Sequence, residues 1–277
     1  KEIRKIRQQL QDYNTRATNQ KIEMLFVDRD LEDLGVEINR LIDLFVAANR
    51  DKIRFESEQK QAIANISHDL RTPLTSILGF LQMAQSTHVS EEEKAEYLMI
   101  AKQRAKRLET LLNDFFELSL IESPDYQLES KRINLKQVTI DTLISFYDLF
   151  NQHHIEPTID LPDHDIFIMA DLSAVTRIIE NLLSNAVIHS DGNLTISLRE
   201  SNFTVHLMIS NDAHHLTEQD VTHLLDRFYM ADQSRSGKST GLGLSIVKSL
   251  LEKMGGHIKI SLNHGNLSIT CEWTSVT

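Results

Sequence analysis

One histidine in the sequence has neighbours suited to chemistry. In Ser67-His68-Asp69-Leu70-Arg71-Thr72-Pro73-Leu74, a carboxylate follows His68 directly and the hydroxyl of Thr72 comes four residues later. Positions i and i+4 of a helix share a face, so this hydroxyl is expected beside the imidazole. Pro73 in mid-helix costs about 3 kcal/mol, which a helix selected for stability alone would avoid. A lone helical histidine is usually structural, but this pattern favours a reactive, solvent-accessible imidazole.

Two asparagines later in the chain form a second pattern. Asn181 and Asn185, in Asn181-Leu182-Leu183-Ser184-Asn185-Ala186, stand one helical turn apart, so both amides project from one face. An amide oxygen is a hard ligand suited to Mg²⁺ that carries ATP phosphates. The alternative interpretation is a capping or surface polar pair.

A pair of glycines before a predicted helix forms the third pattern. Thr240-Gly241-Leu242-Gly243-Leu244 follows a Ser/Gly/Lys-rich segment at 233–240, with Asp226-Arg227-Phe228-Tyr229 upstream. Glycines let backbone N–H groups approach a phosphate, and the helix N-terminus adds a favourable dipole. The pattern predicts a phosphate-binding loop.

In this order, the three patterns resemble the phosphoacceptor box, the N box, and the F box, ATP lid and G2 box of bacterial sensor histidine kinases. The resemblance implies that His68 is phosphorylated, that Asp69 takes its ring proton, and that Thr72 positions water when the partner protein is dephosphorylated. It implies ATP as the phosphoryl donor and Mg²⁺ on Asn185. The nucleotide contacts that it implies are Asn181, Asn185, His189, Phe228, Arg235, Lys238, Thr240, Gly241, Leu242, Gly243 and Leu244.

The sequence departs from this family in two places. The aspartate that reads the adenine amino group, with its two following glycines, appears here as Asn211-Asp212-Ala213-His214-His215. Asn211 holds the aspartate position and can accept through its amide oxygen, and Asp212, one position away, is the reserve candidate. The family's Lys-Tyr after the N box is Ile188-His189, so a phosphate-binding lysine is missing and Lys238 or Arg235 would have to compensate.

Three regions must position these residues. Residues 1–50 are predicted to form two amphipathic helical pieces around a polar connector, which resembles the HAMP signal-transfer module, with a plain coiled-coil linker as the alternative. Residues 51–125 are predicted to form a helical hairpin, broken at 86–90, where Ser90 and Glu93 make a capping box. Each helix has one apolar seam, and a homodimeric four-helix bundle would bury both. The seam of the second helix consists of Leu98, Ala101, Ala105, Leu108, Leu112 and Phe115. Residues 126–277 mix short strands at 167–169, 195–198, 205–209 and 258–261 with helices at 172–189 and 243–254, which indicates an α+β sandwich.

Composition limits the partners. The chain has 29 basic and 40 acidic residues, a net charge of −11, which disfavours nucleic acid as a ligand. The single cysteine, Cys271, suits a reducing compartment. No apolar run reaches the ~18–20 residues of a membrane span. Because the sequence begins with Lys1, we expect a cytoplasmic fragment with a membrane anchor upstream.

The predicted fold class is multi-domain, α and α+β. A long helical hairpin forms a dimeric four-helix bundle, and an ATP-binding α/β sandwich of the gyrase, Hsp90 and histidine kinase type follows. The predicted function is autophosphorylation on His68, then transfer to an aspartate of a response regulator receiver domain, with phosphatase activity toward it. The alternatives are a gyrase-type ATPase, disfavoured because Asn181 replaces its glutamate base, and a non-catalytic scaffold, motivated by Ile188 and Ala213.

Overall fold

The computed structural model describes residues 7–9, 29–86, 89–190, 192–231 and 240–276. The side chains of residues 29–32, 51, 55–66, 68 and 69 also lie outside the description. The chain divides into two units, Lys1–Ala64 and Asn65–Thr277, each of which is described by itself. Of the predicted first helical piece only residues 7–9 are described, as helix. The apolar residues of the predicted connector, Ile22, Leu25 and Val27, lie outside the described residues, whereas its acidic end, predicted to reach Asp33, is helical from Arg29 on as the start of α2.

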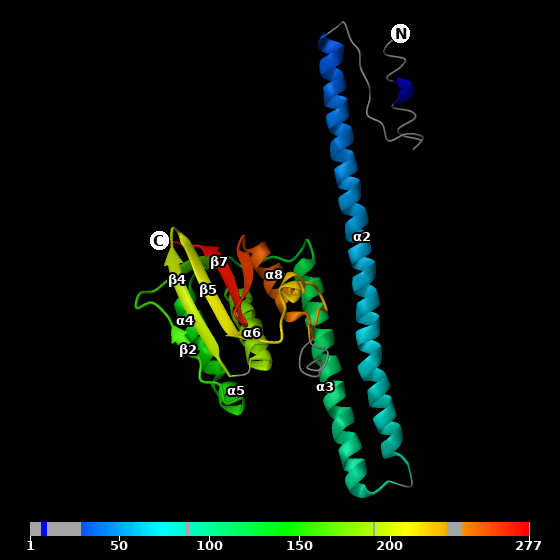
Figure 1. Ribbon diagram of the computed structural model, residues 1–277, viewed down its shortest axis with the longest axis vertical. Coiled ribbons are helices and arrows are strands. Elements are labelled where there is room, and N and C mark those ends of the chain that lie inside the picture. Colours follow the sequence, from blue (N-terminus) through cyan, green and yellow to red (C-terminus); the bar gives the residue numbers. More distant parts are fainter. Residues whose placement is uncertain (1–6, 10–28, 87–88, 191, 232–239, 277) are drawn as a thin grey trace. The chain divides into compact units, whose positions relative to one another are not determined.

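Two long helices are followed by a mixed α/β domain (Figure 1). The helices are α2 (Arg29–Ala84), α3 (Glu91–Glu122), α4 (Leu135–Ser145), α5 (Tyr147–Gln152), α6 (Leu172–His189), α7 (Glu218–His223) and α8 (Gly243–Lys253). The strands are β1 (Lys131–Asn134), β2 (Thr158–Asp160), β3 (Phe167–Ala170), β4 (Leu194–Ser201), β5 (Thr204–Asp212), β6 (His257–Asn263) and β7 (Asn266–Thr274).

The predicted helical hairpin is present, with Pro73 inside α2. Ser90 caps α3 as expected, because its hydroxyl accepts from the backbone N–H of Glu93 and the Glu93 carboxylate accepts from the backbone N–H of Ser90. The rings of Phe80 and Tyr97, whose centroids are 6.1 Å apart, join the two helices near the turn. Among the described residues, no helix is both long enough and apolar enough to cross a membrane.

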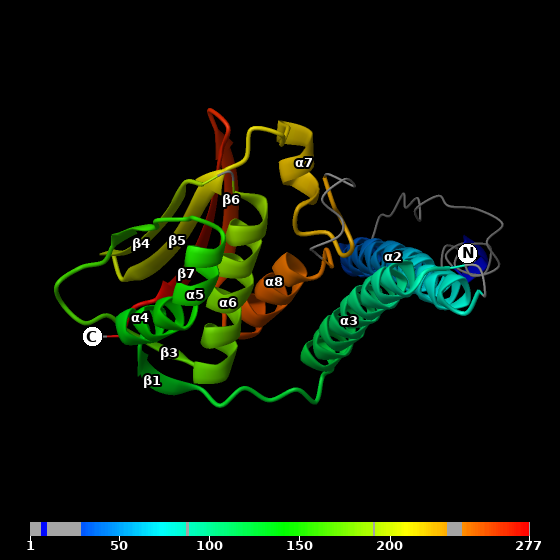
Figure 2. The same cartoon turned by 90° about the horizontal axis from the view of Figure 1, so that it is seen from below.

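A five-stranded sheet organises the second domain. Its order is β2-β4-β5-β7-β6, with β2 parallel to β4 and the other neighbours antiparallel, and β1 pairs with β3 in a separate two-stranded sheet. Buried residues alternate with less buried ones along β7 and the first six residues of β5, so one face of the sheet packs on the core and the other is mostly polar. Helices α4, α6 and α8 cover the buried face (Figure 2).

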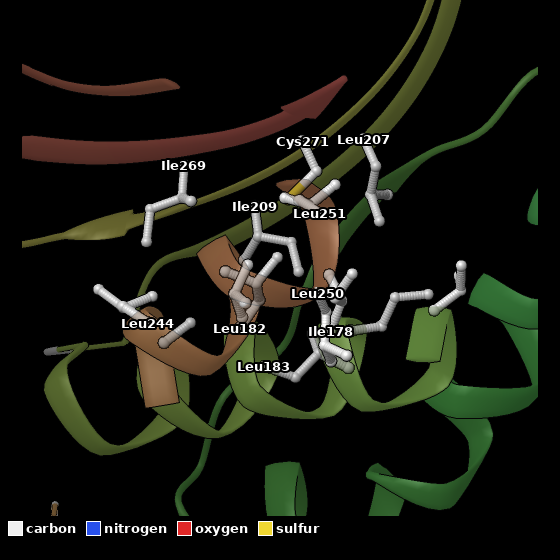
Figure 3. Close-up of a cluster of buried hydrophobic side chains, with 14 of the residues drawn as sticks. Ile178, Leu182, Leu183, Leu207, Ile209, Leu244, Leu250, Leu251, Ile269 and Cys271 are labelled. Carbon is white, nitrogen blue, oxygen red and sulfur yellow. The ribbon is translucent and has the colours of Figure 1, made fainter. Parts of the chain in front are cut away.

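Helix α6 forms where the sequence predicts it. The Asp171 side chain accepts a hydrogen bond from the backbone N–H of Ala174 at 3.0 Å and so caps the helix. Its buried residues recur in adjacent pairs every four positions, which turns one continuous face toward the sheet. Figure 3 shows this face, with Ile178, Leu182 and Leu183, against β5, β7 and α8. The helix therefore holds its polar face, which carries the two asparagines, at a fixed distance from the strands.

Candidate nucleotide-binding and phosphoacceptor sites

The phosphoacceptor segment is helical throughout. His68 and Asp69 lie within α2, and their side chains belong to the part of the chain that is not described. Thr72, one turn beyond His68, is exposed, and Leu70 packs against the hydrophobic core. The backbone thus gives His68 and Thr72 the one-turn spacing that the sequence predicts.

A pocket in the α/β domain collects most of the predicted nucleotide contacts. Its wall is formed by α6, the end of β5, the segment before residue 232, the glycine loop and part of α3. The lining residues are Thr110, Asp114, Asn181, Ser184, Asn185, Ile188, His189, Asn211, Ala213, His215, Leu216, Leu224, Tyr229, Met230, Ala231, Thr240, Gly241, Gly243, Leu244 and Leu267. Arg235 and Lys238, the predicted lid cations, lie outside the described residues.

The two asparagines of α6 both line this pocket. Asn181 donates its amide to the carbonyl of Arg177 at 2.9 Å, and its Oδ1 faces Gly243, where an added Cβ would lie 3.2 Å away. The described residues hold no group of three His, Cys, Asp or Glu side chains that could bind a metal. Asn185 offers an amide oxygen, the type of ligand that Mg²⁺ prefers.

Asn211 and Asp212 have different surroundings. Asn211 is buried, lines the pocket and donates its amide to the carbonyl of Asp212 at 2.9 Å, which directs its amide oxygen away from that bond. The Asp212 carboxylate lies outside the lining, where it accepts from the Ser190 hydroxyl at 2.6 Å and from the Asn193 amide at 3.2 Å. Asp212 thus holds the turn before β4, while Asn211 faces the cavity.

The glycine loop is fixed by the upstream Asp226-Arg227-Phe228-Tyr229 segment. Gly241 has φ +71°, and its carbonyl accepts from the Phe228 N–H at 2.9 Å. The Phe228 side chain is in the core and Leu242 is fully buried, so neither lines the pocket, whereas Thr240, Gly241, Gly243 and Leu244 do. Phe228 and Leu242, which were predicted to contact the nucleotide, instead anchor the glycine loop to the hydrophobic core.

Tyr229 is a pocket residue that the sequence interpretation did not include. Its hydroxyl donates to Asp220, the residue that caps α7 together with Thr217. The hydroxyls of Thr217 and Tyr229 hold the pKa of the Asp220 carboxyl at about 2, and the bond to this carboxylate raises the pKa of Tyr229 to about 12. Tyr229 thereby ties the wall of the pocket to α7.

Helix α3 also contributes to the wall, which sequence patterns did not indicate. The Thr240 hydroxyl donates to the Asp114 carboxylate at 2.7 Å. Arg177 of α6 donates to Asp114 at 3.3 Å and, through Nε, to Glu117 at 2.8 Å. Burial raises the pKa of the Asp114 carboxyl above its usual value, although Thr240 and Arg177 both favour the charged form. Asp114 is far from Thr240 and Arg177 in sequence, so only the folded structure reveals their contact.

Two family models match the chain. The model described as the His Kinase A (phospho-acceptor) domain matches residues 58–124, which include His68. The model described as Histidine kinase-, DNA gyrase B-, and HSP90-like ATPase matches residues 170–275, which include every described predicted nucleotide contact. The predicted order of a phosphoacceptor hairpin followed by an ATP-binding domain is confirmed.

Similar proteins of known family are also sensor histidine kinases. The sensor histidine kinase YcbM of Bacillus subtilis (strain 168) is 31% identical over 240 residues, which are 84% of this chain and 76% of YcbM. The sensor histidine kinase WalK of the same organism is 30% identical over 212 residues, 74% of this chain but only 34% of WalK. The solved structure of the histidine kinase ThkA in complex with the response regulator protein TrrA has the same fold, with a TM-score of 0.68 at 20% identity, over 82% of this chain and 65% of that one.

Proposed function

This chain belongs to the sensor histidine kinases of bacterial two-component systems, and we propose that His68 is the residue to which it transfers the γ-phosphoryl group of ATP. The family is that of ATP-dependent protein-histidine kinases, as the sequence predicted. The observation that carries the residue assignment is the pocket that unites Asn185, Asn211 and the glycine loop in a domain that follows a phosphoacceptor helix containing His68.

Each residue has a distinct part in the proposed reaction. A ring nitrogen of His68 forms a bond to the γ-phosphorus while the bond to the β-phosphate oxygen breaks and ADP leaves. Asp69 receives the ring proton and keeps the imidazole in its nucleophilic form. Phosphoryl transfer depends mostly on positioning and charge stabilisation, which the backbone N–H groups of the glycine loop can supply. Asn181 cannot activate water as a carboxylate would, which favours transfer over hydrolysis.

The nucleotide is proposed to lie with its base near Asn211 and its phosphates near Asn185 and Thr240. Asn211 is buried, and the geometry of its amide leaves the oxygen available to accept from the adenine amino group. Asn185 is the proposed protein ligand of Mg²⁺, which would neutralise phosphate charge when bound. His189 lines the same cavity and is proposed to contact the base.

The proposed assembly is a homodimer with a four-helix bundle. Leu74, Leu78 and Leu81 recur at steps of four and three on α2 and are 48, 59 and 37% exposed in the single chain. On α3, Phe116 and Leu120 are also exposed and one turn apart. A second hairpin would cover such apolar faces. Measuring the mass in solution tests this proposal, because Leu78→Glu should convert the dimer to a monomer.

The proposed partner is the receiver domain of a response regulator, which would accept the phosphoryl group on an aspartate. ThkA was solved with such a regulator, and this chain shares its fold. Exposed Thr72 is proposed to position water when the regulator is dephosphorylated. The boundaries at 50 and 125, a HAMP-like or coiled-coil first region, an upstream membrane anchor and a cytoplasmic location stay predictions, and fractionation of cells that express the complete gene would check the last two.

Labelling with γ-³²P ATP tests the central assignment. The wild-type chain should acquire label that is lost in acid, and His68→Gln should acquire none. His257→Gln, at an exposed position of β6, is the matched control and should label normally. Retained acid-labile phosphate in the His68 variant would show that another histidine is the acceptor, and release of free phosphate without labelling would indicate an ATPase.

A further inference from the structure

The nucleotide pocket contains a negative charge that comes from outside the ATP-binding motifs. Asp114 of α3 lines the pocket together with Asn185 and Thr240, and its side chain is only 14% exposed. Among the lining residues that the structure describes, none is a lysine or an arginine, and Asp114 is the single carboxylate. Arg177 pairs with Oδ1 of this carboxylate at 3.3 Å, whereas Oδ2 is held by Thr240 at the glycine loop, so a phosphate that enters the cavity at the loop approaches a like charge.

The Asp114 carboxylate accepts a hydrogen bond from the Thr240 hydroxyl, a donor that a phosphate at the glycine loop would also use. The Thr240 hydroxyl has one proton, and it donates that proton to Asp114 at 2.7 Å. Thr240 begins the glycine loop, and its hydroxyl also accepts from the Leu242 N–H at 3.4 Å. A phosphate oxygen at the loop and the Asp114 carboxylate thus compete for one donor, so both cannot be fully satisfied together.

The contact with Asp114 is part of the attachment of α3 to the ATP-binding domain. Leu111, Leu118 and Ile121 of α3 belong to the same buried cluster as the residues of α6 and α8. Arg177 donates to Asp114 and to Glu117, and Arg227 donates to Glu122. Asp114 differs from Glu117 and Glu122 in that it also lines the nucleotide pocket.

We propose that Asp114 makes nucleotide binding sensitive to phosphate charge: the attached α3 accepts an uncharged nucleoside but is displaced by a nucleoside triphosphate. Adenosine fills the base end near Asn211 and leaves the bond between Thr240 and Asp114 intact. A triphosphate removes that bond and repels the carboxylate, so its binding releases α3. By linkage, attachment of α3 weakens triphosphate binding by the same factor. The inference rests on the nucleotide site proposed above.

Binding measurements on the full chain separate charge from shape. Asp114→Asn keeps the size of the side chain and removes its charge. It should tighten binding of a non-hydrolysable ATP analogue about tenfold, as expected for removal of one like-charge contact in a partly buried site, and should change adenosine binding less than twofold. Glu117→Gln is the matched control, because it loosens the same contact with Arg177 without removing a charge from the pocket.

A distance measurement tests the release of α3. Fluorophores can be attached at Ser119 of α3 and Glu252 of α8, both exposed, because the native Cys271 is fully buried. In the wild type and in Glu117→Gln, the ATP analogue should separate the labels and adenosine should not. In Asp114→Asn, this difference between the two ligands should be lost.

The outcomes distinguish this inference from the nucleotide site itself. If Asp114→Asn binds the analogue no more tightly than the wild type, or if adenosine separates the labels as well as the analogue does, the role of Asp114 is overturned. If neither ligand binds the wild type, or if Asn211→Ala leaves adenosine affinity unchanged, the proposed site is wrong.

Discussion

Replacing Gly241 with alanine is expected to damage the nucleotide pocket while the domain stays folded. Gly241 has φ +71°, where a side chain is strained. An added Cβ would lie 2.9 Å from both the Cα and the carbonyl carbon of Phe228, and 3.1 Å from the carbonyl oxygen of Tyr229. These are backbone atoms, so a change of rotamer cannot relieve the contact.

The two effects give the size of the change. A left-handed conformation costs an alanine about 1–2 kcal/mol, and forcing a methyl group into a filled space costs about 1–3 kcal/mol more. Their sum of about 2–5 kcal/mol is comparable with the lower end of the total stability of a domain, about 5–15 kcal/mol. Since moving the loop relieves both effects, we expect the bond between the Phe228 N–H and the Gly241 carbonyl, 2.9 Å long, to break first.

Gly255 provides a matched control for the backbone effect. It has φ +70°, but nothing lies within 4 Å of an added Cβ, so Gly255→Ala should cost only about 1–2 kcal/mol. Trp273 is the single tryptophan of the chain and is buried on β7, so its fluorescence follows urea unfolding of this domain for both variants. Binding of an ATP analogue to each variant completes the comparison.

Gly241→Ala should lose more stability than Gly255→Ala and bind the analogue at least tenfold more weakly, while Gly255→Ala should bind normally. Equal stability losses would mean that the approach to Phe228 does not constrain the loop. Analogue affinity within twofold of wild type in Gly241→Ala would mean that the loop does not contact the phosphates.

Further variants test other parts of the site and domain. Asn185→Ala should remove most kinase activity and Asn185→Asp should alter its metal dependence, measured as label transfer against Mg²⁺ concentration; normal activity of the alanine variant would exclude Asn185 as the ligand. Thr72→Ala keeps helix propensity high and should leave autophosphorylation near normal while slowing loss of phosphate from the regulator; equal changes in both rates would indicate a change of helix geometry around Pro73. Burial raises the pKa of the Cys271 thiol well above its usual value, so a thiol reagent should react with it only after urea unfolding, and fast reaction of the native chain would contradict its position. The pKa of Asp220 is lowered to about 2, so the stabilisation that it gives α7 should be complete above about pH 4 and disappear as the pH falls through 2; exchange of α7 amides that already rises near pH 4 would refute this.

The elements that could be predicted from sequence have a strong apolar period and clear ends. The helix predicted over 172–189 agrees with α6 because its buried residues form one continuous face and Asp171 caps it. The predicted strands at 167–169, 195–198, 205–209 and 258–261 lie within β3, β4, β5 and β6. By contrast, β2 has three residues that are all exposed, and β1 has two exposed residues followed by two half-buried ones, so no alternation marks either strand.

Some residues of the pocket could be predicted from short sequence motifs, and others enter it only through tertiary contacts. The asparagine pair is one short stretch of sequence and the glycine loop is another, so each could be found locally. The fold brings the two stretches together. Family spacing put Asn211 first and Asp212 in reserve, and adjacent strand residues face opposite sides of a sheet, so the two side chains are expected to have different surroundings. The structure places Asn211 in the pocket lining and Asp212 against Ser190 and Asn193. Tyr229 and Asp114 enter the lining through tertiary contacts alone.

Helix α3 has two apolar faces, whereas its sequence predicted one apolar seam. The predicted seam runs through Leu108 and Leu112, both half-buried, whereas Leu111, Leu118 and Ile121 are buried against the ATP-binding domain. Leu111 and Leu112 are adjacent, so they point about 100° apart around the helix and serve different neighbours.

The two faces also set how strongly a nucleotide can act on α3. Burial of Leu111, Leu118 and Ile121 contributes about 1.5–3 kcal/mol for each side chain, or about 5–9 kcal/mol together as an upper estimate. Holding the domain in one orientation costs about 4–15 kcal/mol in lost freedom, less for tethered parts. The two ranges overlap, so the free energy of attachment is a difference of comparable terms and is sensitive to individual contacts. If a bound triphosphate replaces the hydrogen bond between Thr240 and Asp114 and repels the carboxylate, a tenfold change in the attachment equilibrium corresponds to about 1.4 kcal/mol, which is within the range of these two effects.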